Sequence, residues 1–195
     1  MDGDYDSHTA LVVVDVQNDF ADPEGGLYVP GGEEVVPAVN HEIEQARNAG
    51  ALVVYTQDWH PPSTPHFETE GGVWPVHCVQ GTWGAELHPD LRVVGEVIKK
   101  GTGGEDGYSG FSVRDPQRGD EQDTALERVL RDASVEKVVV VGLAADVCVK
   151  DTALDAVGRG FRTTVPRRAT RAVGAEPGDG EGAMEELRAA GVDVR

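Results

Sequence analysis

The sequence predicts an α/β protein with three layers, α/β/α, in which helices cover both faces of a mostly parallel sheet of six strands. Short β-branched runs alternate along the chain with amphipathic stretches, and this alternation is typical of parallel sheets covered by helices. The 195 residues, 39% of them hydrophobic, are enough for one domain with its own core. We therefore expect a single domain spanning residues 1–195.

Six runs are predicted as strands: 9–16, 51–57, 94–99, 135–141, 161–165 and 192–194. The first is continuously apolar up to Asp15, which suits a strand buried on both faces. Four amphipathic segments are predicted as helices: 33–48, 123–132, 151–157 and 181–190. In the first helix, Val36, Val39 and Ile43 recur at helical spacing, and Gly50 provides a stop signal.

Two long segments, 58–91 and 101–118, break this rhythm with Pro, Gly, Trp and His. Long irregular segments inside a domain usually build sites, and parallel sheets bind ligands beyond the carboxyl ends of their strands. Asp15, Asp58 and Lys100 stand at such ends, and the turn after strand 135–141 leads to Cys148. We expect these four side chains to meet.

Acidic residues outnumber basic ones by 35 to 17, giving a net charge of -18. Such a charge repels phosphate backbones and anionic membrane surfaces, so we expect neither nucleic acid nor membrane as a partner. The acidic segment 1–8 lacks the features of a secretory signal. Two cysteines do not make a disulfide framework. These features predict a cytoplasmic protein, and a homo-oligomer is compatible with them.

Cys148 lies in the turn Gly142-Leu-Ala-Ala-Asp-Val-Cys148. If Asp146 caps the following helix, Cys148 falls in the first helical turn. There the helix dipole favours a thiolate, and free N–H groups can face a developing oxyanion. The alternative is a buried cysteine that acts as a small apolar filler.

Asp15 and a neighbouring lysine could complete a nucleophilic site. A carboxylate at Asp15 can accept the thiol proton and return it to a leaving amine, although a turn residue is the simpler interpretation. A lysine buried beside it would keep the carboxylate ionised. Lys99 and Lys100 both qualify from the residues alone, since adjacent strand residues face opposite ways.

A metal site is suggested by Asp58, His60, His66 and His77, which fall within twenty residues of a chain that has six histidines. One carboxylate with two or three imidazoles suits Zn, Fe or Mn and leaves positions open for water or ligand. The alternative is a loop with scattered polar residues. The Gly-rich segment 101–110 has neither dinucleotide nor phosphate-loop spacing, and Phe111 replaces the second glycine of a nucleophile elbow.

Together these segments resemble the isochorismatase-like cysteine hydrolases, and within them the nicotinamidases, also called pyrazinamidases. The matching pieces, in the family's order, are Val14-Asp-Val-Gln-Asn-Asp-Phe20, Asp58-Trp-His60, His66-Phe67, Trp74-Pro-Val-His-Cys78, Lys100-Gly101, Tyr108-Ser-Gly-Phe111 and Gly142-Leu-Ala-Ala-Asp-Val-Cys148. Each piece is short, but the joint match is highly specific and runs across most of the chain.

The resemblance implies a catalytic triad of Asp15, Lys100 and Cys148, and it favours Lys100 over Lys99 because the family's lysine directly precedes glycine. It implies an oxyanion site made by the N–H groups of Ala144 and Cys148, with a cis peptide before Ala144. The remaining implied residues are the divalent-metal ligands Asp58, His60 and His77, with His66 added in some members, and the aromatic pocket residues Phe20, Trp74 and Tyr108. Val147 departs from the histidine of some bacterial members.

The implied reaction is hydrolysis of nicotinamide, and of pyrazinamide, to the acid and ammonia through a thioester, a step of NAD metabolism. Other members hydrolyse carbamoyl groups or the vinyl ether of isochorismate. A vinyl ether needs no cysteine nucleophile, and carbamoyl substrates are handled without the metal residues. A non-enzymatic binding domain is the remaining alternative, and it predicts an unreactive Cys148.

Overall fold

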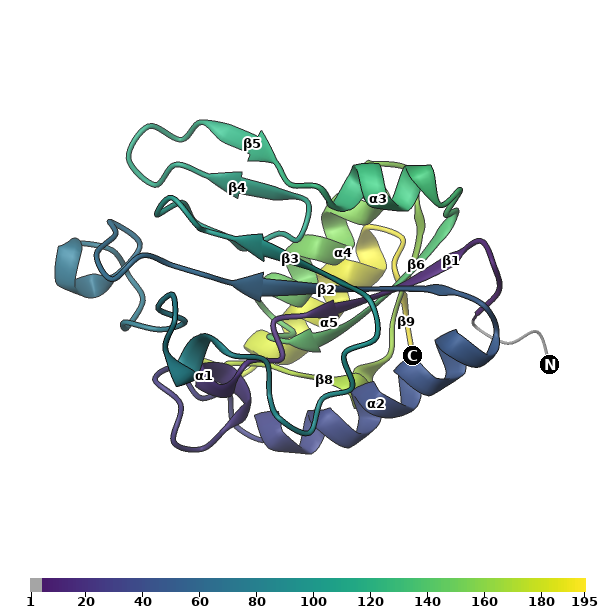
Figure 1. Cartoon of the computed structure of the whole chain (residues 1–195), viewed down its shortest axis with the longest axis horizontal. Helices are drawn as coiled ribbons and strands as arrows, with labels where there is room; N and C mark the ends of the chain where they lie inside the picture. Colours follow the sequence, from purple (N-terminus) through teal and green to yellow (C-terminus); the bar gives the residue numbers. More distant parts are fainter. Residues whose placement is uncertain (1–4) are drawn as a thin grey trace.

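The central sheet of the computed structural model, which describes residues 5–195, is parallel throughout (Figure 1). Six strands follow one another in the order β3-β2-β1-β6-β7-β9, and a two-residue strand, β8, also pairs with β6. Their bounds are β1 Thr9–Val14, β2 Leu52–Asp58, β3 Glu96–Lys100, β6 Lys137–Leu143, β7 Arg162–Val165, β8 Thr170–Arg171 and β9 Asp193–Val194. The six-stranded parallel sheet predicted from the sequence is confirmed.

Helices cover both faces of this sheet (Figure 1). On one face lies α2 (Gly32–Asn48), and on the other lie α3 (Leu126–Asp132), α4 (Cys148–Gly158) and α5 (Asp179–Ala189). Successive residues of a strand point to opposite faces, so Leu11 of β1 packs in the cluster of Ile43 of α2, whereas Val12 packs with Val149 of α4. The predicted α/β/α layers are thus confirmed.

The secondary structure differs from the prediction in the region where two short polar segments pair as strands. Asp123, which we assigned to the start of a helix, is the last residue of the strand β5 (Glu121–Asp123), which forms a small antiparallel hairpin with β4 (Ser112–Arg114). The helix α3 therefore begins only at Leu126. A four-residue helix, α1 (Asn18–Ala21), and three short 3-10 turns were also not predicted.

The predicted cap of α4 was wrong. The helix begins at Cys148, with Val147 in the cap position. The carboxylate of Asp146 instead accepts hydrogen bonds from the N–H groups of Val173 and Gly174, each at 2.9 Å. Asp146 therefore connects the turn to the chain after β8. Its two carboxylate oxygens accept these N–H groups, and neither caps the helix. Cys148 still lies in the first turn of the helix, as expected.

The strand order brings the candidate residues to one edge. The pairing of β1 with β6 places Val14 beside Gly142. The segments that follow these two strands therefore start next to each other. A Cβ at Gly142 would lie 2.1 Å from the carbonyl oxygen of Val14, which explains the glycine before the turn to Cys148. The pairing of β2 with β3 sets Asp58 opposite Lys100.

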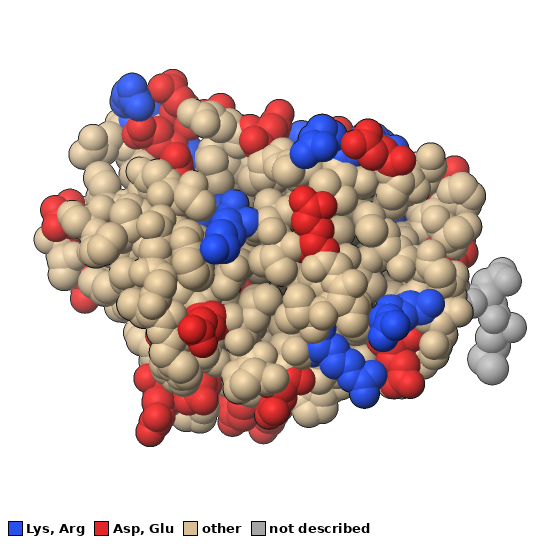
Figure 2. Space-filling view, viewed as in Figure 1, with Lys and Arg blue, Asp and Glu red and all other residues tan. Residues whose placement is uncertain are grey.

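The excess of acidic over basic residues is visible on the protein surface. Figure 2 shows Asp and Glu side chains gathered along the lower left edge, over α1 and the start of α2. In residues 5–195 no helix is long and apolar enough to cross a membrane. Residues 1–4, part of the acidic N-terminal segment on which the signal-peptide argument rests, lie outside the described residues.

Candidate active site

Lys100 lies at the centre of a buried polar cluster. Its ammonium Nζ is 2.7 Å from Oδ2 of Asp15, 2.6 Å from Oδ1 of Asp58 and 3.9 Å from Sγ of Cys148. It also donates a hydrogen bond to the carbonyl oxygen of Gly107. Lys99 faces the other way, with its Nζ 3.5 Å from the centroid of a Trp59 ring. The geometry thus brings Lys100, and not Lys99, to Asp15 and Cys148.

The Asp15 carboxylate is held at both of its oxygens. Its Oδ1 accepts a 2.7 Å hydrogen bond from the hydroxyl of Thr56. Its Oδ2 forms an ion pair with the ammonium of Lys100 at 2.7 Å. Burial raises the pKa of Asp15 to about 6, although Lys100 pulls it down. At neutral pH Asp15 is therefore a carboxylate with a lone pair available for a proton.

The pKa values of Cys148 and Lys100, the two groups beside Asp15, both lie well above that of Asp15. Burial, together with the charges of Asp15 and Asp58, raises the pKa of the Cys148 thiol well above its usual value, against the pull of Lys100. Burial thus acts in the direction opposite to the helix-dipole effect that we expected to favour a thiolate. Burial works against the charge of Lys100, but the two carboxylates dominate and raise its pKa. The resting cluster holds a protonated thiol, an ammonium and two carboxylates.

Two residues of the turn that leads to Cys148 line the pocket beside the cluster, and in residues 5–195 their N–H groups are free of the turn's backbone hydrogen bonds. The peptide between Leu143 and Ala144 is cis, as the family resemblance implied. Within the described chain, the backbone hydrogen bonds of this turn use the N–H groups of Ala145, Val147 and Val149 as donors, and those of Ala144 and Cys148 are not among them. The first N–H groups of a helix have no partner inside the helix. They are available to an oxyanion.

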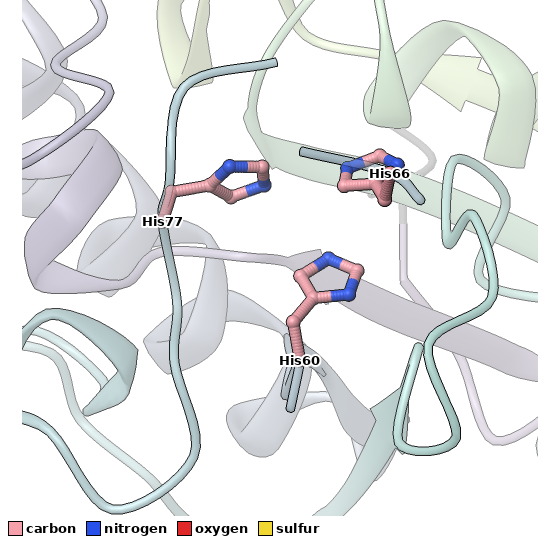
Figure 3. A group of neighbouring side chains, drawn as sticks. All are labelled: His60, His66 and His77. Atoms are coloured by element: carbon pink, nitrogen blue, oxygen red, sulfur yellow. The ribbon is translucent and has the colours of Figure 1, made fainter. Parts of the chain in front are cut away.

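Three imidazoles converge next to the cluster. His60, His66 and His77 each offer a nitrogen, and these nitrogens all lie within 4.8 Å of one another (Figure 3). Asp58 adjoins them, with Oδ2 3.9 Å from Nε2 of His60. Both ring nitrogens of His60 are buried without a hydrogen-bond partner in the described residues. Buried polar atoms are rarely left unpaired, so these nitrogens favour a bound cation.

The other two histidines each have one nitrogen engaged at Nδ1. That of His66 lies 2.6 Å from Oδ1 of Asp106, and that of His77 lies 2.7 Å from the carbonyl oxygen of Pro75. Burial lowers the pKa of His60 to about 4 and also lowers that of His77. Neutral imidazoles with a carboxylate are ligands that suit Zn, Fe or Mn. The residues therefore fit a divalent metal ion.

Asp58 adjoins the histidine group, and its pKa responds to two of these histidines. Burial alone would raise its pKa, but Lys100, His60 and His77 together lower it below the usual value. Asp15, Asp58 and Cys148 also bring three ligand atoms within 4.8 Å. The ammonium of Lys100 contacts all three residues, so a second cation there would meet a positive charge.

One pocket joins the two groups. Its empty volume is about 410 Å³, open solvent at the mouth included, and its wall contains Cys148 and Ala144 together with Asp58, His66 and His77. The three aromatic residues expected from the resemblance line the same pocket: Phe20, Trp74 and Tyr108. The indole N–H of Trp74 donates a 2.9 Å hydrogen bond to the Tyr108 hydroxyl.

The sequence alone did not reveal several residues that shape this site. The apolar side chains of Leu27, Val29 and Val173 complete the pocket wall, and nothing in their sequence context marks them. Gln17 was inside a recognised motif but received no role. Its amide brackets Asp58, donating to the Asp58 carbonyl oxygen and accepting from the Asp58 N–H, each at 2.8 Å.

A parallel sheet with a buried thiol, a carboxylate and a lysine together at its carboxyl edge is the arrangement expected of a cysteine hydrolase of the α/β/α class. The isochorismatase domain matches residues 9–195, and the chain belongs to this family. The nicotinamidase of Escherichia coli K12 is 38% identical over 203 residues, covering 95% of this chain and 93% of that protein.

Two solved structures share the fold closely. The pyrazinamidase of Pyrococcus horikoshii in complex with zinc is 40% identical, with a TM-score of 0.85 over 96% of this chain and 98% of that one. The PnC1 protein of L. infantum in complex with nicotinate is 36% identical, with a TM-score of 0.87 over 98% and 94%. The family predicted from the sequence is confirmed.

Proposed function

We propose that the chain is a metal-dependent cysteine amidohydrolase that converts nicotinamide to nicotinate and ammonia, and that also accepts pyrazinamide. The observation that carries the proposal is the shared pocket, in which the Cys148 thiol and the histidine group face the same aromatic-walled space. A planar heteroaromatic amide offers a carbonyl to the first and a ring nitrogen to the second. The nicotinamidase and pyrazinamidase relatives support this substrate class.

In the proposed mechanism, the Asp15 carboxylate, which lies within 4.8 Å of the Cys148 sulfur, accepts the proton of Cys148. The thiol holds its proton more tightly than Asp15 in the resting site, so the transfer accompanies attack of sulfur on the amide carbon. The N–H groups of Ala144 and Cys148 donate hydrogen bonds to the developing oxyanion.

Collapse of the tetrahedral intermediate breaks the C–N bond. Asp15 returns the proton to the departing nitrogen, which leaves as ammonia, and the acyl group stays on sulfur as a thioester. Water then attacks the thioester carbon, giving nicotinate and the free thiol of Cys148. Lys100 keeps Asp15 oriented throughout and ionised until it accepts the thiol proton, since both groups are buried and paired.

The metal ligands in this proposal are Asp58, His60 and His77, together with His66. A divalent ion such as Zn, Fe or Mn would supply a positive centre in the pocket wall that orients the ring of the substrate as a template. Asp58 links the two halves of the site, because its other carboxylate oxygen contacts Lys100.

The test is ammonia release by the purified protein from nicotinamide, pyrazinamide, benzamide and a carbamoyl amino acid, with and without prior metal removal. We expect the two ring-nitrogen amides to be hydrolysed fastest, benzamide slowly because it lacks the ring nitrogen, and all rates to fall in metal-free protein. Fast carbamoyl hydrolysis without nicotinamide hydrolysis would overturn the proposed substrate. A Cys148 that a thiol reagent cannot label at neutral pH, with no turnover, would favour a binding domain.

The same proposal places residues 1–195 in a single hydrolase domain acting on a small amide in the cytoplasm. Both cysteines are free and buried, which agrees with a reducing compartment.

A further inference from the structure

Asp106 makes a short contact with one member of the histidine group. Its Oδ1 lies 2.6 Å from Nδ1 of His66, with the His66 side chain 4% exposed and that of Asp106 17% exposed. His77 pairs its Nδ1 with a neutral carbonyl, and the ring nitrogens of His60 have no hydrogen-bond partner among residues 5–195. Within the described residues, Asp106 therefore gives His66 the only carboxylate hydrogen bond to an imidazole of this group.

We propose that Asp106 is a positioning residue for the metal group: its carboxylate holds His66 with the proton on Nδ1, so that Nε2 is the nitrogen offered to a metal ion. The inference rests on the metal dependence proposed above and extends it to a residue outside the ligand set. It also assigns His66 to the ligands, a point that the sequence left open.

The chemistry of the pair supports this role. A neutral imidazole carries its proton on either nitrogen, and the hydrogen bond made by one nitrogen decides the state of the other. An ionised carboxylate can only accept, so Nδ1 of His66 must be the donor. Carboxylate partners of this kind orient the ring and raise the basicity of the ligating nitrogen.

The backbone holds Asp106 firmly for this purpose. Its N–H donates to the carbonyl oxygen of Arg114 at 2.7 Å, and its own carbonyl accepts from the Arg114 N–H at 2.9 Å. Arg114 is the last residue of β4. The β4–β5 hairpin, which the sequence did not predict, thus anchors Asp106 at the site.

The residues after Asp106 show that this segment crosses the whole site. The Gly107 carbonyl oxygen accepts a hydrogen bond from Lys100, and the Tyr108 hydroxyl accepts one from Trp74. Three consecutive residues therefore touch a metal-group histidine, the buried lysine and the pocket wall. A displacement of Asp106 would be transmitted directly to the other two contacts.

The experiment measures zinc affinity by competition with a chromophoric chelator in wild type, Asp106→Ala, Asp106→Asn and Glu105→Gln. Glu105→Gln is the matched control, because it removes the same charge one residue away, where the carboxylate accepts a hydrogen bond from the Gly103 N–H. We expect Asp106→Ala to weaken zinc binding about 10- to 100-fold. Asp106→Asn, which keeps an acceptor oxygen, should lose less, and Glu105→Gln should match wild type.

A second readout is the tautomer of His66, measured by ¹⁵N NMR of histidine-labelled, metal-free protein and assigned with His66→Gln. Wild type should show a protonated Nδ1 and a bare Nε2, and Asp106→Ala should lose this pattern. Thermal unfolding verifies that the variants are folded, and Asp106→Asn carries the test if the alanine variant is not.

The outcomes separate this inference from the proposed function. Zinc affinity in both Asp106 variants equal to that of Glu105→Gln would overturn the role of Asp106, whether or not nicotinamide is hydrolysed. Weakened zinc binding in a protein whose wild type hydrolyses no nicotinamide would overturn the proposed reaction and leave the inference standing. A wild type that binds no zinc would overturn both the metal site and the inference.

Discussion

Replacing Asp15 by asparagine tests the proposed base with almost no change in size. The hydroxyl of Thr56 now donates to Oδ1 of Asp15, and we expect it to keep the amide oxygen of the new side chain there. The amide nitrogen would then occupy the position of Oδ2, facing the ammonium of Lys100 and the thiol of Cys148. It would present a donor where the mechanism needs an acceptor.

The size of the effect follows from these contacts. Loss of general acid–base catalysis costs about 10²- to 10⁴-fold in rate, so turnover should fall at least about a hundredfold. Breaking a buried ion pair by removing one partner costs about 3–5 kcal/mol. Lys100 keeps Asp58 and the Gly107 carbonyl as partners, which places the cost at the lower end. Domains are typically stable by about 5–15 kcal/mol, so the variant should fold.

The assay is ammonia release from nicotinamide, with Asp155→Asn as the matched control. Asp155 accepts a hydrogen bond from Ser109 at 2.6 Å and has no part in the mechanism, so its variant should stay near wild type. In wild type, kcat/KM should fall below pH about 6, because protonated Asp15 can no longer accept the thiol proton. Asp15→Asn should lack this acid limb. Turnover within a few-fold of wild type, with the limb intact, would mean that the base is another group.

Three further substitutions probe the remaining parts of the site. Cys148→Ala should abolish turnover and still bind nicotinamide. Cys78→Ala alters a buried side chain outside the pocket wall and should keep much of its activity. Equal losses of turnover in the two variants would count against a single nucleophile. After gel filtration, elemental analysis of His60→Ala should find no metal, whereas its circular dichroism spectrum should stay near native. Full activity of that metal-free protein would contradict the template role. Gly107→Ala would put a Cβ 3.1 Å from Oδ1 of Asp58 and 3.3 Å from Cγ of Lys100, so turnover should drop about tenfold through misplacement, while Gly158→Ala, which meets no atom within 4 Å, should not change it.

The local apolar pattern was enough to predict most of the fold. Leu11 and Val13 of β1 and the helical spacing in α2 mark their buried faces directly, because burial is what produces the periods of two and 3.6 residues. The β4–β5 hairpin escaped prediction for the same reason. Glu121–Asp123 is polar and exposed throughout, so its sequence carries no alternation that would separate a strand from the start of a helix.

The candidate site was predictable as far as strand ends determine it. Asp15, Asp58 and Lys100 follow parallel strands, whose carboxyl ends lie at one edge whatever the loops do. Their partners could not be predicted, because a hydrogen bond such as that of Thr56 to Asp15 depends on strand register. The contact of Asp106 with His66 depends on two loops meeting across 40 residues of sequence, and no spacing rule describes that.

The neighbours of the two carboxylates beside Lys100 explain how these carboxylates can take different roles. The Nζ of Lys100 contacts Asp15 and Asp58 at nearly equal distances, 2.7 and 2.6 Å, so it does not itself distinguish them. The neighbours do: Asp58 faces His60 and His77 and has a lowered pKa, whereas Asp15 is buried away from them with a pKa of about 6. Paired groups whose pKa values are pushed apart are how active sites divide acid–base work. A carboxylate that stays ionised suits a metal ion, and one that titrates near neutrality suits exchange of a proton with the thiol.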